Sequence, residues 1–379
     1  MRIVISPQEY KGTLTAEEAA AAMAQGARRA LPDADLDVVP LPDGGPGTVR
    51  AIVSITGGDI RPTRVQDPRG RPVDAEWALL PDGSAVIEMA AASGLVLVPE
   101  NERDPRSATT NGVGELLRAA LDAGARRLII GLGGSATNDG GGGMTAALGG
   151  RFLDDAGHEL PPGGAALAHL ARIDVTNLDP RVREAEIVGA SDVTNPLCGP
   201  EGASLIYGPQ KGASPQVARE LDLALKNYAR VVARDLGVSV ADVPGAGAAG
   251  GLGAGLIAFL GADIRPGVEV VAAVVGLRER LQGADLVLTG EGRLDGQTRY
   301  GKTVAGVARM ASDAGVQVIV VPGTLGDGWE SILSLVAHVE AIVAQDVTPE
   351  DAMSRPAELL AATVERVLMG AGRRGPTEP

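Results

Sequence analysis

The sequence predicts an α/β protein with two domains, one of which is a doubly wound parallel sheet built from both ends of the chain. Three observations predict this fold. The 379 residues exceed the usual size of one domain, and 45% of them are hydrophobic, which is enough for a sizeable core. Short apolar stretches alternate with amphipathic helical stretches at both ends of the chain. Neither end alone supplies enough strands for a stable sheet.

The first sixty residues predict two strand–helix units. Thr15 with Glu18 three residues later is a capping-box pattern, which marks the start of the first helix. The expected elements are a strand at 2–6, a helix from 15 to 31, a strand at 36–40 and, after the loop 42–45, a helix over 49–55.

The last hundred residues repeat this alternation. Strands are expected at 284–289, 317–321 and 339–344, and helices at 303–314, 329–337 and 349–369. The five strands from both ends form one doubly wound sheet, so we predict a discontinuous domain of residues 1–62 and 280–372. Residues 63–279 form an inserted α/β domain that opens with short strands and turns, and the tail 373–379 is expected to be disordered. We expect the ligand site in the cleft between the two domains.

Charge and composition exclude several functions. The formal net charge of −14 disfavours binding to nucleic acid or an anionic membrane, and only eight residues are aromatic. The single cysteine, Cys198, excludes an intrachain disulfide, and three scattered histidines exclude a histidine-based zinc site. The sequence shows no signal peptide and no apolar run of membrane-spanning length, so we expect a cytoplasmic protein that acts on a small molecule.

Lysine is rare in this chain, which has four lysines and 30 arginines. Three of the four stand beside a glycine in loop-like sequence, namely Lys11, Lys211 and Lys302, whereas Lys226 lies in an amphipathic helical stretch. A compact ammonium group in a glycine loop suits phosphate, although chance could also place the lysines there.

Two glycine-rich loops could bind phosphate through backbone amides. The first, residues 131–143, follows the apolar strand 128–130, and Ser135, Asn138 and Asp139 add polar groups to it. It also fits the dinucleotide pattern G-x-G-x-x-A, but polar and glycine residues continue where a helix should begin. The second, residues 245–255, fits G-x-G-x-x-G, yet its glycines could equally serve tight packing.

Two further loops carry polar chemistry. Residues 296–303 match the P-loop pattern G-x-x-x-x-G-K-T. About six residues separate the match from the preceding strand, whereas a true P-loop begins where its strand ends. We therefore interpret the match as only partly meaningful. In the other loop, Asp192 and Asn195 follow the strand 185–189 and could bind magnesium or a substrate hydroxyl. The alternative for Asn195-Pro196 is a simple turn.

Taken together, these loops resemble the type-1 glycerate kinase family along nearly the whole chain. Eight blocks occur in the family's order, and their order makes the resemblance specific. They are Lys11-Gly12, Asp43-Gly44-Gly45 with Gly47-Thr48, Glu88 to Gly94, Gly133 to Gly141, Ser191 to Leu197, Tyr207 to Ala213, Pro244 to Gly251, and Thr289 to Asp295 with Gly301-Lys302.

The resemblance implies a two-domain kinase, with a flavodoxin-like first domain, that transfers the γ-phosphoryl group of ATP to D-glycerate with Mg²⁺, usually giving 2-phosphoglycerate. In that hypothesis Asp192 is the base or orients the hydroxyl, with Lys11 and Arg293 as further catalytic residues. The nucleotide would be held by Gly133, Gly134, Ser135, Asn138, Asp139, Lys211 and Lys302. The substrate would contact Asp43, Ser191, Asn195, Glu291 and Gln297, and the metal Asp192, Asn195 and Asp295.

The chain departs from the family at two places. Relatives usually read Pro-Asp-Ser before the aromatic residue and Lys-Gly, whereas this chain has Gln8 and Glu9, and Pro46 replaces an acid. These departures leave two alternatives: a protein that acts on another hydroxy acid, or a metabolite sensor without turnover. A third alternative, an NAD-dependent oxidoreductase of a small hydroxy acid, rests on the two glycine loops. The sequence leaves open the oligomeric state and which hydroxyl is phosphorylated.

Overall fold

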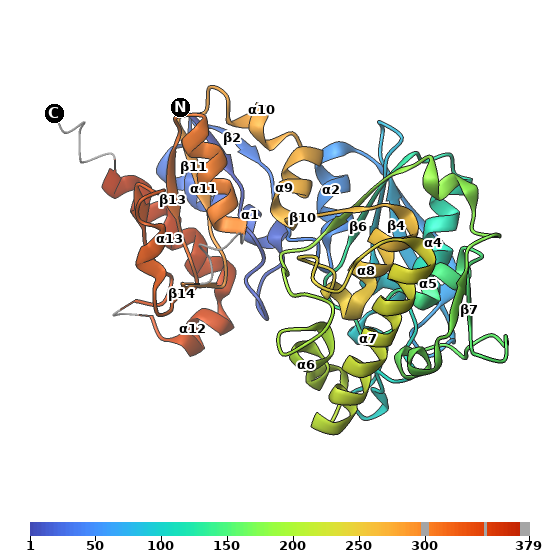
Figure 1. Cartoon of the computed structure of the whole chain (residues 1–379). Helices are drawn as coiled ribbons and strands as arrows, with labels where there is room; N and C mark the ends of the chain where they lie inside the picture. The colour runs from blue at the N-terminus through green and yellow to red at the C-terminus, as the bar shows by residue number, and fades with distance from the viewer. Residues whose placement is uncertain (297–302, 345–346, 372–379) are drawn as a thin grey trace. The chain divides into compact units, whose positions relative to one another are not determined.

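The computed structural model describes residues 1–296, 303–344 and 347–371 (Figure 1). Its contacts divide the chain into a terminal unit, Met1–Asp43 with Val271–Pro379, and a central unit, Gly44–Val270. We had drawn the boundaries at 62/63 and 279/280. Helix α2 (Thr48–Thr56), which we had placed with the N-terminus, instead contacts strands β3 (Asp59–Gln66), β4 (Pro72–Leu79) and β5 (Ala85–Glu88) of the central unit.

The terminal unit contains a five-stranded parallel sheet. Its strands are β1 (Arg2–Ile5), β2 (Asp35–Val38), β11 (Leu286–Thr289), β13 (Gln317–Val320) and β15 (His338–Val339). The spatial order is β2, β1, β11, β13, β15, which is 2-1-3-4-5 when the strands are counted along this unit. That is the flavodoxin-like order of a doubly wound sheet. The predicted fold class is confirmed.

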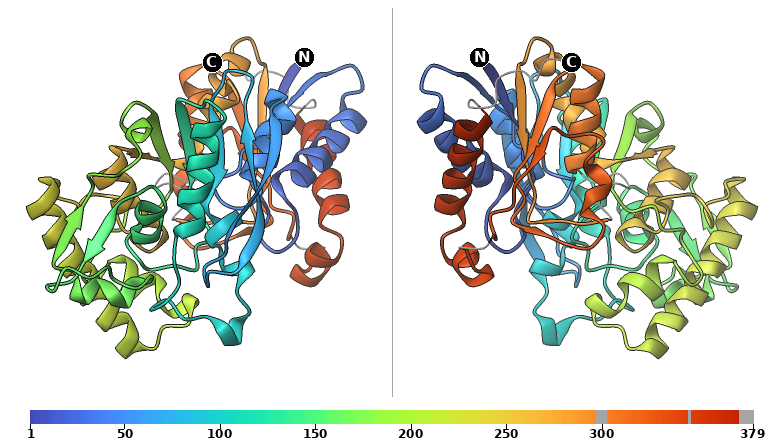
Figure 2. Two further views of the ribbon diagram at one scale, coloured as in Figure 1. Left: turned by 90° about the vertical axis from the view of Figure 1, so that its right-hand side faces the viewer. Right: turned by 90° about the vertical axis from the view of Figure 1, so that its left-hand side faces the viewer.

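Two helices from opposite ends of the chain pack together in the terminal unit. Helix α1 (Ala16–Ala30) begins with the predicted capping box, in which Thr15 and Glu18 bond to each other's backbone amides. It packs against α13 (Pro356–Ala371), seen as blue and red helices side by side in Figure 2. A Cβ on Gly26 would lie 2.2 Å from the carbonyl oxygen of Ala361, so this close approach requires glycine.

Three C-terminal elements differ from the sequence prediction. The helix expected at 329–337 is a single 3₁₀ turn at Trp329–Ile332, and the strand expected at 339–344 is only His338–Val339. The long final helix is divided into α12 (Pro349–Ser354) and α13, because Arg355 leaves helical geometry directly before Pro356. The helix predicted at 303–314 is observed as α11 (Thr303–Asp313). The tail 373–379 lies outside the described residues.

The central unit contains a six-stranded mixed sheet in the order β10, β9, β6, β5, β4, β3. Strand β4 pairs antiparallel with both β3 and β5, and a turn at 67–70 joins β3 to β4. Strand β5 then runs parallel to β6 (Arg127–Gly131), β9 (Glu186–Ala190) and β10 (Asp263–Arg265). The parallel half of the sheet therefore carries the two loops that we had singled out after residues 130 and 189.

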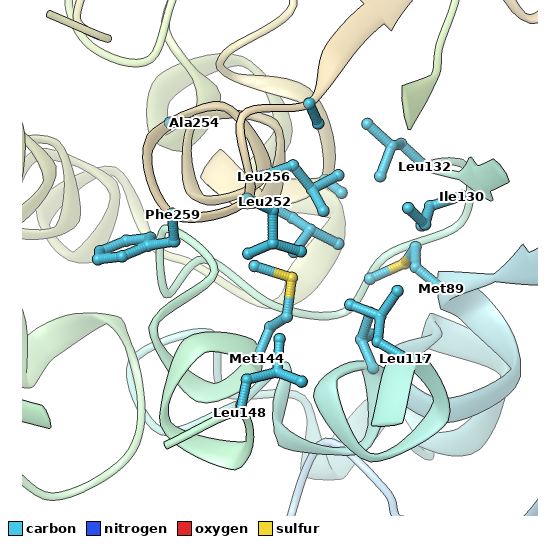
Figure 3. Close-up of a cluster of buried hydrophobic side chains, with 14 of the residues drawn as sticks. Met89, Leu117, Ile130, Leu132, Met144, Leu148, Leu252, Ala254, Leu256 and Phe259 are labelled. Atoms are coloured by element: carbon cyan, nitrogen blue, oxygen red, sulfur yellow. The ribbon is translucent and has the colours of Figure 1, made fainter. Parts of the chain in front are cut away.

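Apolar residues of the sheet and of several helices form the core of the central unit. Among these helices are α3 (Met89–Ser93), α4 (Asn111–Asp122), α5 (Gly142–Ala147), α7 (Pro215–Leu236) and α8 (Ala248–Leu260). Figure 3 shows Met144 and Leu148 on one side of this core and Leu252, Leu256 and Phe259 of α8 on another. Both ends of the first glycine loop, at Ile130 and Met144, are fixed in this core. Among the described residues, no helix has the length and apolarity that a membrane span requires.

Candidate active site

Two polar loops leave the central sheet at the same edge. Gly131, the last residue of β6, pairs with Ala190, the last residue of β9, in parallel register. The glycine loop, residues 131–143, begins at the first of these positions, and the loop with Asp192 begins at the second. Ligands of parallel α/β sheets bind beyond the carboxyl ends of the strands. This edge of the sheet is therefore the candidate site of the central unit.

The glycine loop reaches the surface at Gly134, between half-buried Gly133 and buried Ser135. Gly134 is exposed and has a φ of 73°, a left-handed conformation that favours glycine. Its carbonyl accepts a bond from the amide of Leu95, at 2.9 Å, and the amide of Ala136 donates to Ser93. Within the described residues, the amides of Gly134 and Ser135 have no acceptor. Two fixed amide donors without an acceptor fit an anion such as phosphate.

Lys211 lies beneath the glycine loop and is 1% exposed. Its Nζ donates to Ser135 Oγ at 2.6 Å and to the carbonyl oxygen of Thr137 at 2.7 Å. Burial lowers the pKa of Lys211 to about 7, although the negative charge of Asp139 opposes the shift. We had predicted that Lys211 binds the nucleotide; here its ammonium group is covered by the loop itself.

Asp139 connects the glycine loop to the start of helix α4. Its carboxylate accepts four bonds, from the amide and hydroxyl of Thr110 at 2.8 and 2.9 Å and from the amides of Gly141 and Gly143 at 3.2 and 3.1 Å. It is 1% exposed, and burial raises its pKa. The sequence had predicted a nucleotide contact for Asp139. These bonds hold the loop to the start of α4, and the nucleotide contact stays a prediction.

Asn138 is also buried in this loop. Its Nδ2 donates to Ser204 Oγ at 2.9 Å. Its Oδ1 is buried and has no hydrogen-bond partner in the part of the chain that the structure describes. The amide therefore joins the loop to helix α6 (Ala203–Tyr207) and leaves one acceptor for a small polar group.

The second loop of this edge positions Asp192. Its Oδ1 accepts a bond of 2.8 Å from the amide of Gly267, the first residue of helix α9 (Gly267–Val274). The side chain is half-buried. Ser191 Oγ accepts from the amide of Val193, and Asn195 bonds through Oδ1 to the Tyr207 hydroxyl and through Nδ2 to the carbonyl of Glu201. The loop is thus a structured turn that holds a partly exposed carboxylate.

The glycines at 245–255 pack against the glycine loop. A Cβ on Gly250 would lie 2.0 Å from the carbonyl oxygen of Thr137, and one on Gly255 would lie 2.6 Å from that of Gly140. The amide of Gly140 donates to the carbonyl of Gly250. Of the two interpretations that the sequence left open, these contacts support packing.

The terminal unit holds a separate group of predicted residues at the end of β1. Gln8 Nε2 donates to Asp43 Oδ2 at 2.9 Å, and Gln8 is 6% exposed. Lys11 is exposed. Burial and the nearby charge of Asp43 raise the pKa of Glu9, while Lys11 lowers it. Gln8 stands where the resembled family usually has an aspartate. Asp43 therefore contacts an amide donor in this chain and not a second carboxylate.

The remaining predicted residues of the terminal unit follow β11. Glu291 is 6% exposed. The burial of Tyr10 and the negative charge of Glu291 both raise the pKa of the Tyr10 hydroxyl. This hydroxyl donates a hydrogen bond to the carbonyl of Val321. Arg293 is exposed, with its Nε 3.8 Å from Asp295 Oδ2. The predicted residues Gln297 and Lys302 lie outside the described residues, as does most of the P-loop match.

Sequence reasoning missed several groups that hold the central site. Thr110 and Ser204 bond to loop residues that we had named, and the Tyr228 hydroxyl donates to the carbonyl of Gly140 at 2.8 Å. All three are buried. Thr110 directly precedes α4, whereas Ser204 and Tyr228 belong to α6 and α7, and no local motif marks them.

The candidate site offers oxygen atoms to a magnesium ion, although it has no cluster of acidic side chains in the described residues. Within residues 1–296, 303–344 and 347–371, no three His, Cys, Asp or Glu side chains gather closely enough to hold a metal ion. Asp192 and Asn195 offer oxygen atoms of the kind that Mg²⁺ prefers, and Mg²⁺ commonly takes one or two protein oxygens together with phosphates and water. The donor set therefore fits a metal that arrives with a phosphate ligand.

Comparisons with known proteins show the family of this chain. The model of the glycerate kinase family matches residues 3–370. Glycerate 2-kinase of Escherichia coli K12 is 46% identical over 381 residues, 98% of this chain and all of that one, and glycerate kinase of Halalkalibacterium halodurans is 50% identical over 331 residues, 87% of each chain. A crystal structure of a Salmonella typhimurium LT2 protein assigned as glycerate kinase 2 superposes with a TM-score of 0.87 at 48% identity, covering 98% of this chain and 99% of that one. The chain therefore belongs to the glycerate kinase family and is a kinase by that membership.

Proposed function

We propose that this protein transfers the γ-phosphoryl group of ATP to a hydroxyl of D-glycerate and releases 2-phosphoglycerate and ADP. Family membership supports the acceptor, because the similar proteins are named glycerate kinase and glycerate 2-kinase. The observation that carries the proposal is the pairing of Gly131 with Ala190, which starts the glycine loop and the Asp192 loop at one sheet edge. We place the reaction in the cytoplasm, with a small-molecule substrate.

The glycine loop would bind the phosphates of the nucleotide. The amides of Gly134 and Ser135 supply donors that need no rearrangement, and Gly133 and Gly134 allow close approach. Asn138 and Asp139 would act by fixing the loop, and Lys211 adds positive charge beneath it. Positioning and charge neutralisation are the main tasks of a phosphoryl-transfer enzyme.

Asp192 would orient the attacking hydroxyl of glycerate and accept its proton. The amide of Gly267 fixes one carboxylate oxygen, which orients the group, and the half-buried side chain can reach a ligand at the sheet edge. Ser191 and Asn195 border the same turn and would contact the acceptor. When Mg²⁺ is bound with the nucleotide it neutralises phosphate charge, and Asp192, Asn195 and Asp295 are the candidate ligands.

Residues of the terminal unit are proposed, by the family resemblance, for further contacts with charged and polar groups of the ligands. Lys11 and Arg293 are exposed cations suited to phosphate or to the substrate carboxylate, and Lys302 would serve the nucleotide. Asp43, Glu291 and Gln297 are proposed for the hydroxyl groups of the acceptor.

Phosphorus NMR of the product tests the proposal. The protein is incubated with D-glycerate and Mg-ATP, and the new resonance is compared with authentic 2- and 3-phosphoglycerate. The expected result is 2-phosphoglycerate with an equal amount of ADP. A 3-phosphoglycerate signal would overturn the regiochemistry, whereas binding of both ligands with no product would favour the metabolite sensor. An Asp192→Asn sample distinguishes enzymatic turnover from a contaminating kinase.

A further inference from the structure

The glycine loop is held from below by one buried cation that comes from a different part of the chain. Lys211 ends the 3₁₀ turn Pro209–Lys211, and the following Gly212 has a φ of 95°. A Cβ on Gly212 would lie 2.6 Å from the carbonyl oxygen of Arg103, so this turn is packed tightly in place. The lysine therefore reaches the loop from a fixed base.

The two bonds of Lys211 fix the loop at the position of its free amides. The ammonium group donates to Ser135 Oγ at 2.6 Å and to the Thr137 carbonyl at 2.7 Å. Ser135 and Gly134 carry the two loop amides for which the described part of the chain offers no acceptor. A bond to a charged donor is about twice as strong as a neutral one. Its loss would release this part of the loop.

Lys211 is too deeply buried to act as a surface cation. With 1% of its surface exposed, its Nζ lies behind Ser135 and Thr137. The exposed face of the loop belongs to Gly134. A phosphate bound to the Gly134 amide would thus be attracted by the positive charge of Lys211 but would not contact its ammonium group.

We propose that Lys211 is the positioning residue of the nucleotide loop, holding Gly134 and Ser135 in the conformation that binds the triphosphate without itself contacting the nucleotide. This inference rests on the proposed function, because it takes the glycine loop as the nucleotide site. It assigns Lys211 a role that acts through Ser135.

Binding of Mg-AMPPNP, a non-hydrolysable ATP analogue, to four variants tests the proposal. Titration calorimetry is run on Lys211→Met, Ser135→Ala, the double variant and Lys226→Met, whose exposed lysine pairs with Asp222 at 2.7 Å. We expect Lys211→Met to weaken binding about tenfold or more, since a charge-assisted bond is lost. Ser135→Ala should weaken it less, and the double variant should match Lys211→Met. Lys226→Met should bind like the wild type.

The non-additivity is the decisive result, because residues that act through one contact give coupled effects. Steady-state kinetics should show a raised KM for Mg-ATP with little change in the KM for D-glycerate, a split that general loss of stability would not produce. If Lys211→Met fails to fold, Ser135→Ala still tests the contact. Additive losses would show direct contact with the nucleotide and overturn the proposal, as would unchanged binding in both single variants.

The titration also separates this inference from the proposed function. AMPPNP binding needs no acceptor, so a wild-type protein that binds the analogue but leaves D-glycerate unchanged would contradict the proposed function alone. A wild-type protein that does not bind Mg-AMPPNP would overturn both.

Discussion

Asp192 accepts a hydrogen bond of 2.8 Å from the amide of Gly267, which ties the loop after β9 to the start of helix α9. Asn at position 192 can keep this bond through its Oδ1 while it loses the charge and the ability to accept a proton. We therefore expect Asp192→Asn to lower kcat by a factor on the order of 100 or more, with a modest change in nucleotide affinity. Coupled-assay kinetics and nucleotide titration measure the two effects.

The matched control for this variant is Asp263→Asn. Asp263 belongs to β10, the neighbouring strand, and its carboxylate is 75% exposed and lies 4.0 Å from Arg265. Its turnover should equal that of the wild type. Turnover near the wild-type rate in Asp192→Asn would rule out Asp192 as the base.

The second prediction concerns Asp139 and stability. Replacing it with alanine leaves four donors, on Thr110, Gly141 and Gly143, without their acceptor in a buried place. We expect the free energy of unfolding to fall by about 3 kcal/mol or more, as measured by urea denaturation. The exposed Asp155, replaced by alanine in the same way, should cost no more than about 0.5 kcal/mol. Equal costs would show that the carboxylate does not hold the loop.

The third prediction tests the packing of the second glycine-rich stretch. Gly250 and Gly83 both have a positive φ, 68° and 82°, but only Gly250 has close neighbours, with the Thr137 oxygen 2.0 Å from an added Cβ. Gly83→Ala should cost about 1 kcal/mol of unfolding free energy, from backbone strain alone. Gly250→Ala should cost about 3 kcal/mol, because overpacking is added. If the two costs agree, contact with the glycine loop has no energetic weight.

Local signals in the sequence were enough for most of the fold. The Thr15–Glu18 capping box and the alternation of apolar stretches predicted α1 and the five parallel strands of the terminal unit, in an arrangement that the structure confirms. The prediction was wrong for C-terminal segments whose composition is helical but which do not form one continuous helix. Pro356 divides the last helix, and residues 329–337 have helical composition but form only one 3₁₀ turn.

Local signals also picked out the loops of the candidate site, but not the contacts of the residues within them. Asp139 was predicted to contact the nucleotide because polar loop residues usually face solvent, and that contact stays a prediction. Its actual partner, Thr110, lies 29 positions earlier, and burial depends on the packing of α4. Lys211 meets Ser135 across 76 positions. Such distant contacts follow from the tertiary fold, so a motif can name the residue but not what it contacts.

The last prediction concerns pH, and it follows from the burial of Lys211. Burial lowers the pKa of Lys211 to about 7 in the folded chain, with Asp139 as the charged group that opposes the shift, whereas an unfolded lysine titrates near about 10.4. Below about pH 7 both states carry the proton, so this group adds no pH dependence. Above that pH the unfolded chain binds more protons than the folded chain. Stability should therefore rise with pH by up to about 1.4 kcal/mol per unit from this residue.

Lys211→Met removes this titration and leaves the other ionisable groups in place. The free energy of unfolding of both proteins is measured with urea between about pH 6 and pH 9. The value for the wild type minus the value for Lys211→Met should rise with pH, and this rise should occur mainly above about pH 7. Burying the charged form costs free energy that is relieved only when the folded state loses the proton, so the sign of the slope is fixed. Parallel curves for the two proteins would mean that Lys211 keeps an ordinary pKa and that its ammonium group is better solvated than its burial indicates.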